Sequence, residues 1–371
     1  MRALFIHDPH DLDALIPGGV QICTRDFLEV VTEASSAVEL FPVHVSRNLW
    51  WRIRRRAGLG SYLLYRPSDV CRSLQEAFEK FHPTHVFLNR TELLRLAPLV
   101  RELSGNAKVV ILSHGNQSGD DLYEVSGPGG RRRDGLAHLV ATWKLGSDLI
   151  TESSFRHQWI DVVCVMSGEE EILERWLGAK STVVIPRLVR SALLEWHPTP
   201  MRVGFVGTLD HTPNRTAISY ILNELMAFSD DDFEFRLVGG PLSVGEAFAE
   251  QYPFVSYLGM LSNEELRAEV SSWSLFLNPI FWLSRGASMK LGQAIAWGLP
   301  SLSTRSGVRG YQLLPGQVIV SSDTVTAFVS EMQALLSDLP RLQALRNSLL
   351  HLQSDEHSLR SLGMKLRSML E

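Results

Sequence analysis

The chain has 371 residues, of which 45 % are hydrophobic and 21 % charged, and its net charge is −5 at pH 7. This length suits two domains, and the composition excludes a disordered chain, a collagen-like chain and a coiled coil. The acidic balance argues against nucleic-acid binding, and three widely spaced cysteines supply neither a disulfide framework nor a zinc site.

The first half of the sequence alternates short apolar runs with helix-like stretches. A Pro/Gly-rich loop at 16–19 follows the first run and leads into an expected helix. The runs typical of strands are 2–7, 84–89, 108–115, 161–168 and 181–186. Such runs between helices indicate βαβ units and a parallel sheet.

The same alternation restarts after 191–200, which contains two prolines and reads as a linker. The expected strands of this half are 201–209, 233–240, 254–259, 274–279, 299–304 and 317–322. Ser262 and Glu265 have the spacing of a capping box at the start of a helix. We therefore expect two Rossmann-like α/β domains, 1–190 and 191–355, with a cleft between them. The helix at 356–371 is expected to pack back on the first domain.

Candidate binding residues follow the strands, because ligands of open α/β sheets bind beyond the carboxyl ends of strands. Gly207 and Thr208 form a turn after one strand, and Asn214 and Arg215 stand at the start of the next helix. Free N–H groups at a helix start favour an anion. The alternative is an ordinary strand-to-helix turn with Asn214 as a cap. His114, after the strand at 108–115, is either a ligand contact or a loop residue.

The segment 284–300 carries a second candidate. Lys290 stands at the front of an otherwise apolar helix, where a lysine is unfavourable for the helix dipole unless an anion joins it. A diphosphate would supply that anion, and Arg285 could grip it bidentately. The alternative leaves both cations solvated at the helix edge.

The stretch Lys290–Pro300, KLGQAIAWGLP, resembles the hallmark of retaining glycosyltransferases of family 4. GFVGTLDHTPN, RLVGG, VSYLG and SLFLNP precede it in the family's order. The similarity covers most of the chain, strongly over 204–310 and weakly over 47–86. It implies the GT-B architecture, in which two Rossmann-like domains with parallel sheets face each other across a cleft.

The resemblance also implies a function: transfer of a sugar, with retention, from a UDP- or GDP-linked donor to a glycan or a lipid-linked acceptor. Cell-surface or exported polysaccharide synthesis would be the setting, and neither a metal nor a further cofactor is expected. The residues expected to take part in catalysis are Lys290, Arg215 and His114. Those expected to bind the donor are Gly207, Thr208, Asn214, Gly239, Arg285, Gly286, Ser288 and Gln293.

The sequence departs from the family at the donor site. Family members commonly have two glutamates eight residues apart, where this chain has Arg285 and Gln293. A glutamine can still bond ribose hydroxyls, whereas the arginine removes a carboxylate that touches the donor sugar. The departure leaves open a glycan-binding or partner subunit with a decayed donor site, and a sugar-nucleotide epimerase of the same fold.

The acceptor is expected to meet the first domain at Gly18, Gly19, Arg52 and Arg54. The segment 49–56, LWWRIRRR, combines tryptophans with arginines, a mixture that suits the headgroup region of an anionic membrane. The alternative is a solvated basic helix whose tryptophans pack inward. No apolar run approaches the ~18 residues of a membrane span. We therefore expect a cytoplasmic protein, and the basic segment leaves open a peripheral place on the inner membrane face.

Overall fold

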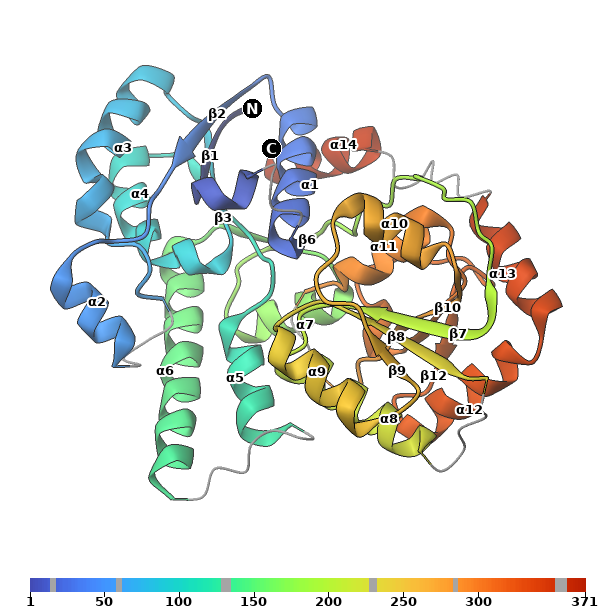
Figure 1. The fold of residues 1–371 in the computed structure, drawn as a ribbon. Coiled ribbons are helices and arrows are strands. Elements are labelled where there is room, and N and C mark those ends of the chain that lie inside the picture. Colours follow the sequence, from blue (N-terminus) through green and yellow to red (C-terminus); the bar gives the residue numbers. More distant parts are fainter. Residues whose placement is uncertain (14–17, 58–61, 128–134, 227–231, 283–285, 351–358) are drawn as a thin grey trace.

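The computed structural model describes residues 1–13, 18–57, 62–127, 135–226, 232–282, 286–350 and 359–371. These residues form two α/β domains that lie side by side, each built on a sheet of six parallel strands with flanking helices (Figure 1). The expected fold class, two Rossmann-like domains with parallel sheets, is confirmed.

The first sheet has the strand order β2-β1-β3-β4-β5-β6. Its strands are β1 (Arg2–His7), β2 (Ala37–Pro42), β3 (His85–Asn89), β4 (Lys108–Leu112), β5 (Val162–Val165) and β6 (Thr182–Val184). The helices of this domain are η1 (Pro9–Leu12), α1 (Gly19–Ala34), α2 (Leu49–Arg56), α3 (Pro67–Phe81), η2 (Thr91–Leu96), α4 (Ala97–Ser104), α5 (Gln117–Ser126), α6 (Leu136–Trp159) and α7 (Gly168–Trp176). Apolar side chains of the strands are buried between these helices in two clusters, one on each face.

The second sheet has the order β12-β11-β10-β7-β8-β9. Its strands are β7 (Thr199–Val206), β8 (Glu234–Val238), β9 (Val255–Tyr257), β10 (Trp273–Asn278), β11 (Ser301–Thr304) and β12 (Ile319–Ser321). The helices are α8 (Thr212–Leu225), α9 (Leu242–Gln251), α10 (Asn263–Val270), α11 (Met289–Trp297), η3 (Ser306–Val308), α12 (Val325–Leu336) and α13 (Leu339–Leu350). The capping box of α10 forms as expected: Ser262 Oγ accepts from Glu265 N–H, and the Glu265 carboxylate accepts from Ser262 N–H.

The last helix, α14 (Leu359–Leu370), lies against α1 of the first domain (Figure 1). Leu362, Leu366 and Leu370 are buried in the cluster that α1 forms with the first sheet. Gly363 allows the two helices to approach, since a Cβ there would lie 2.5 Å from Glu33 Cγ. The chain therefore returns to its first domain after completing the second.

The structure differs from the sequence expectation mainly at the edges of the sheets. β2 is an edge strand with no fully buried residue, so it lacks the continuous apolar run of the central strands. β7 begins at Thr199, inside the stretch expected to be a linker. Among the described residues, no helix has the length and apolarity to cross a bilayer.

Candidate functional site

A cavity of about 480 Å³ opens between the two domains. The first domain contributes the start of α1, and the second contributes the turns after β7, β8 and β9 together with one side of α11. Its wall contains eight of the residues expected from the sequence to bind or act on a substrate: Gly18, Gly19, Gly207, Thr208, Asn214, Gly239, Lys290 and Gln293. The carboxyl ends of strands from both sheets therefore supply one shared site.

Two glycine turns shape the floor of this cavity. Gly239 has a φ of +137°, and a Cβ at this position would lie 1.9 Å from the carbonyl oxygen of Gly207. The Gly207 N–H donates to the Val238 carbonyl at 3.0 Å, which ties the two turns together. Because only glycine fits this approach, a side chain at residue 239 would push the turns apart.

Lys290 is held by a chain of two hydrogen bonds. Its Nζ donates to Asn214 Oδ1 at 2.6 Å, and Asn214 Nδ2 donates to the Thr208 carbonyl at 2.8 Å. The ammonium also lies 4.4 Å from the centre of the Phe205 ring. These contacts aim the lysine at the space between the β7–α8 turn and the first turn of α11.

The electrostatic state of Lys290 is unusual for a lysine. Burial lowers its pKa to about 7, because a charged ammonium is costly in a poorly solvated place. Among the described residues no carboxylate forms an ion pair with it. The site therefore holds, near a helix N-terminus, a lysine that is only partly charged near pH 7 and has no described carboxylate beside it, so an anionic ligand would favour its ammonium form.

Gln293, one turn further along α11, lines the same cavity. Its side-chain amide has no hydrogen-bond partner within the part of the chain that the structure describes. Apolar side chains form the wall next to it, and their residues are Val206, Val238, Leu261, Leu266, Phe276 and Trp297. An amide beside an apolar wall suits a ligand with a flat or hydrophobic part next to its hydroxyl groups.

The expected residues Gly286, Ser288 and His114 lie outside the lining of the cavity, and Gly286 and His114 meet at the contact between the domains. Ser288 precedes α11 and donates its hydroxyl to Asn278 Oδ1 at 2.7 Å. His114 Nε2 bonds to Asn89 Oδ1 at 3.1 Å. A Cβ on Gly286 would lie 2.9 Å from the His114 carbonyl oxygen, so the two loops touch.

Sequence reasoning missed Glu170, which joins the two domains. Its carboxylate accepts from Gly286 N–H at 2.9 Å and from Met166 N–H at 3.1 Å. Burial raises the pKa of this carboxyl group. In the sequence Glu170 is one of three consecutive glutamates at a helix start, and nothing there marks which of them turns inward.

Three of the expected residues stand apart from the cavity. Arg215 is half-buried on α8 and does not line it. Arg52 and Arg54 are exposed on α2, on the side of the first domain away from the second (Figure 1). Arg285 lies outside the described residues. The roles expected for these four residues stay predictions.

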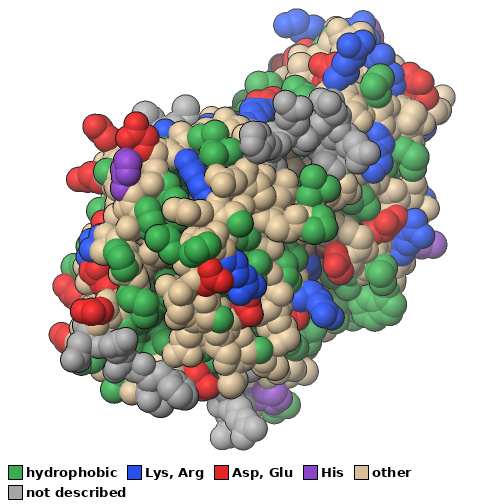
Figure 2. Space-filling view, turned by 90° about the vertical axis from the view of Figure 1, so that its right-hand side faces the viewer, with side chains coloured by type: hydrophobic (Ala, Val, Ile, Leu, Met, Phe, Trp, Pro, Cys, Tyr) green, Lys and Arg blue, Asp and Glu red, His purple; other side chains and the backbone are tan. Residues whose placement is uncertain are grey.

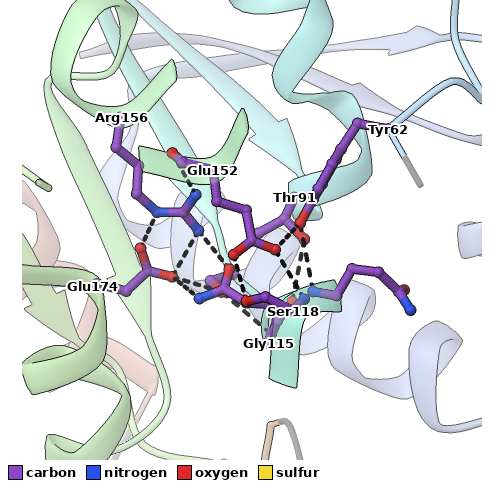
Figure 3. A network of polar contacts seen from close by, with 10 residues as sticks. Tyr62, Thr91, Gly115, Ser118, Glu152, Arg156 and Glu174 are labelled. Atoms are coloured by element: carbon purple, nitrogen blue, oxygen red, sulfur yellow. Dashed lines mark hydrogen bonds and ion pairs between the residues drawn. The ribbon is translucent and has the colours of Figure 1, made fainter. Parts of the chain in front are cut away.

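A buried polar network holds the loop that carries His114 (Figure 3). Arg156 is fully buried on α6 and pairs with Glu174 of α7, and both bond to the Asn116 side chain. Glu152 accepts from Ser118 N–H at 3.1 Å and from the Tyr62 hydroxyl. Asn116 of the β4–α5 loop and Ser118 at the start of α5 are thereby tied to α6 and α7 behind them.

The second domain matches a known protein family. Residues 200–338 match the family described as Glycosyl transferases group 1. This range contains the β7–α8 turn, Lys290 and Gln293. No curated protein matches the chain in sequence.

Solved structures resemble the chain over its whole length. Sucrose-phosphate synthase from Thermosynechococcus elongatus has a TM-score of 0.68 at 16 % identity, covering 99 % of this chain and 98 % of that one. HepE from Anabaena, in complex with UDP, has a TM-score of 0.67 at 12 % identity, covering 100 % and 99 %. The lipopolysaccharide outer core galactosyltransferase WaaB has 0.62 at 14 %, covering both chains fully.

At such low identity these structures establish the fold, and the family match adds the assignment of one domain. Residues 200–338 form a glycosyl transferases group 1 domain in a chain of GT-B fold, and together these findings support a transferase.

Proposed function

We propose that the protein transfers a sugar from a nucleoside diphosphate sugar, linked to UDP or GDP, to a hydroxyl group of a glycan or a lipid-linked acceptor. The observation that carries this proposal is a buried lysine at the cavity without a described carboxylate partner: Lys290 has a pKa lowered to about 7, and its described neighbours are an amide and an aromatic ring. A diphosphate supplies the missing negative charge.

The remaining wall of the cavity fits the other parts of such a donor. The Gly207 and Gly239 turns let the backbone approach a phosphate or ribose closely. The Gln293 amide can bond ribose hydroxyls, and the apolar wall beside it can receive a base. UDP is the ligand of HepE, the Anabaena relative in fold, which favours UDP as the first nucleotide to test.

In the proposed reaction the bond between the sugar's anomeric carbon and the diphosphate oxygen breaks, and a bond from that carbon to the acceptor oxygen forms. Negative charge grows on the leaving diphosphate. A fixed ammonium and helix N–H groups stabilise that charge more in the transition state than in the ground state. The acceptor proton passes to the departing phosphate, and the acceptor attacks on the same face, so configuration is retained without a metal ion.

The proposed setting is the cytoplasmic synthesis of a cell-surface or exported glycan. The structural relative WaaB, a lipopolysaccharide galactosyltransferase, is consistent with this setting. An acceptor that enters from the first domain would pass the α1 start at Gly18 and Gly19, where Gly19 packs closely against Met289 of α11.

Calorimetric titration with UDP, GDP and their sugars tests the proposal. We expect one nucleotide to bind the wild type, and Lys290→Ala to weaken that binding at least tenfold. Lys80→Ala is the matched control, because Lys80 is exposed on α3. If a folded wild type binds no nucleotide, the proposal is wrong, and a glycan-binding or partner subunit becomes the better account.

A further inference from the structure

Helix α2 turns apolar side chains outward together with its arginines. Leu49, Trp50 and Ile53 are exposed, Trp50 to 73 %. Trp51 turns inward and is half-buried, with the Arg54 guanidinium 5.8 Å from its ring. The helix therefore exposes Trp50 and its arginines to solvent. On a helix that faces only water, the tryptophan would usually be buried.

Helix α6 carries a longer apolar stripe. Leu136, Leu139, Val140, Trp143 and Ile150 are all exposed, Leu136 to 77 %. The spacing of these residues places them on one helical face that is about 21 Å long at 1.5 Å per residue. Residues 136–140 are all exposed, so the first turns of α6 project from the domain. Protein surfaces rarely leave such a contiguous stripe uncovered.

The two helices lie on the same side of the first domain. Arg95 lies near both helices, because charges on each of them act on it. Burial and the charge of Arg54 on α2 lower the pKa of Arg95, whereas Asp148 on α6 raises it. Both helices project below the first sheet at the lower left of Figure 1. We call the exposed residues Leu49, Trp50, Arg52, Ile53, Arg54, Arg56, Leu136, Leu139, Val140 and Trp143 the α2/α6 surface.

The charge of the α2/α6 surface has one sign. The sequence contains no Asp or Glu from 40 to 68, a range with six arginines, and none from 135 to 147. By contrast, the face in Figure 2 mixes acidic, basic and apolar side chains. Apolar and aromatic side chains among arginines that form no ion pair with another described residue match a layer that has anionic headgroups above hydrocarbon.

We propose that the α2/α6 surface docks the protein on an anionic lipid bilayer, with Trp50 and the tip of α6 at the headgroup level. A second copy of the chain fits less well, because a symmetric contact would set arginines against arginines. The attachment is peripheral. It does not rest on the proposed transferase function, because binding to vesicles is measured without turnover.

Flotation with phosphatidylcholine vesicles, with and without phosphatidylglycerol, tests the docking. We expect the wild type to float only with the anionic vesicles. Arg52→Gln/Arg54→Gln/Arg56→Gln should reduce partitioning about a hundredfold, since each arginine near the surface contributes about fivefold. Leu139→Ser/Trp143→Ser should also release the protein, and does so without changing its charge.

Two matched controls keep the test specific. Arg72→Gln/Arg267→Gln/Arg360→Gln removes the same charge from exposed positions on α3, α10 and α14. Met364→Ser/Met369→Ser removes exposed apolar groups from α14. The proposal is overturned if the wild type stays unbound to anionic vesicles, or if the controls lose as much binding as the surface variants. It is also overturned if light scattering shows a dimer that Leu139→Ser/Trp143→Ser converts to a monomer.

Discussion

The carboxylate of Glu170, in the first domain, accepts a hydrogen bond of 2.9 Å from the backbone N–H of Gly286, in the second. Gly286 belongs to the segment that leads into α11, and α11 carries Lys290 and Gln293. One buried carboxylate therefore fixes the segment before α11 in the second domain relative to α7 of the first.

The first prediction concerns this carboxylate and pH. Burial raises the pKa of Glu170 in the folded protein above its unfolded value, so folding favours its protonated form. We expect the unfolding free energy of the wild type, relative to Glu170→Gln, to increase as pH falls through the folded pKa and to level off below the unfolded one. Denaturant unfolding between pH 4 and 8 measures this difference. A difference that shrinks as pH falls would contradict the assignment.

The second prediction concerns the glycine turns. Gly239→Ala should destabilise the protein by at least about 2 kcal/mol, since the residue has positive φ and its Cβ would meet the Gly207 carbonyl. The nucleotide affinity should fall as well. Gly146→Ala is the control, because Gly146 lies in α6 and no atom lies within 4 Å of a Cβ built there. Replacing this helical glycine by alanine should raise the unfolding free energy by about 0.5–1 kcal/mol. Thermal and chemical unfolding of both variants measure these changes in unfolding free energy, and a Gly239→Ala variant as stable as the wild type would contradict the prediction.

The third prediction concerns the network behind the His114 loop. Arg156→Met leaves the Glu174 carboxylate buried without its cation, which should cost about 3–5 kcal/mol. Arg156→Met/Glu174→Leu should recover part of that loss, because the uncompensated charge is gone. Arg175→Met removes an exposed arginine from its pair with the half-buried Glu171, which should cost less than about 1 kcal/mol. Urea unfolding measures both costs in unfolding free energy. If Arg156→Met costs no more than Arg175→Met, the network does not stabilise the protein.

Much of the architecture could be predicted from the sequence, because central parallel strands are continuous apolar runs. The run at 108–115 contains β4, and that at 274–279 contains most of β10. β2 could not be found in this way, since an edge strand is half-exposed and its pattern is mixed. The prediction of a capping box at Ser262 and Glu265 was correct because a capping box depends only on residues three apart in the sequence.

The site was predictable where its residues follow strand ends or begin helices. Lys290 and Asn214 lie in the first turns of α11 and α8, and the cavity brings them together. Glu170 was not predictable, because its partner Gly286 is far away in the sequence and only domain packing joins them. The apolar wall at Leu261 and Leu266 was missed for the same reason: in sequence these leucines look like ordinary core residues.

The most direct test of the central claim is the proton taken up when UDP, or whichever nucleotide the panel selects, binds at pH 8. A lysine of pKa about 7 is mostly neutral at this pH, and a diphosphate beside it favours the ammonium. Calorimetry in buffers of different ionisation enthalpy should show an uptake approaching about one proton for the wild type and for Lys80→Ala, and none for Lys290→Ala. Nucleotide binding without proton uptake, or the same uptake in Lys290→Ala, would contradict the placement of the diphosphate at Lys290.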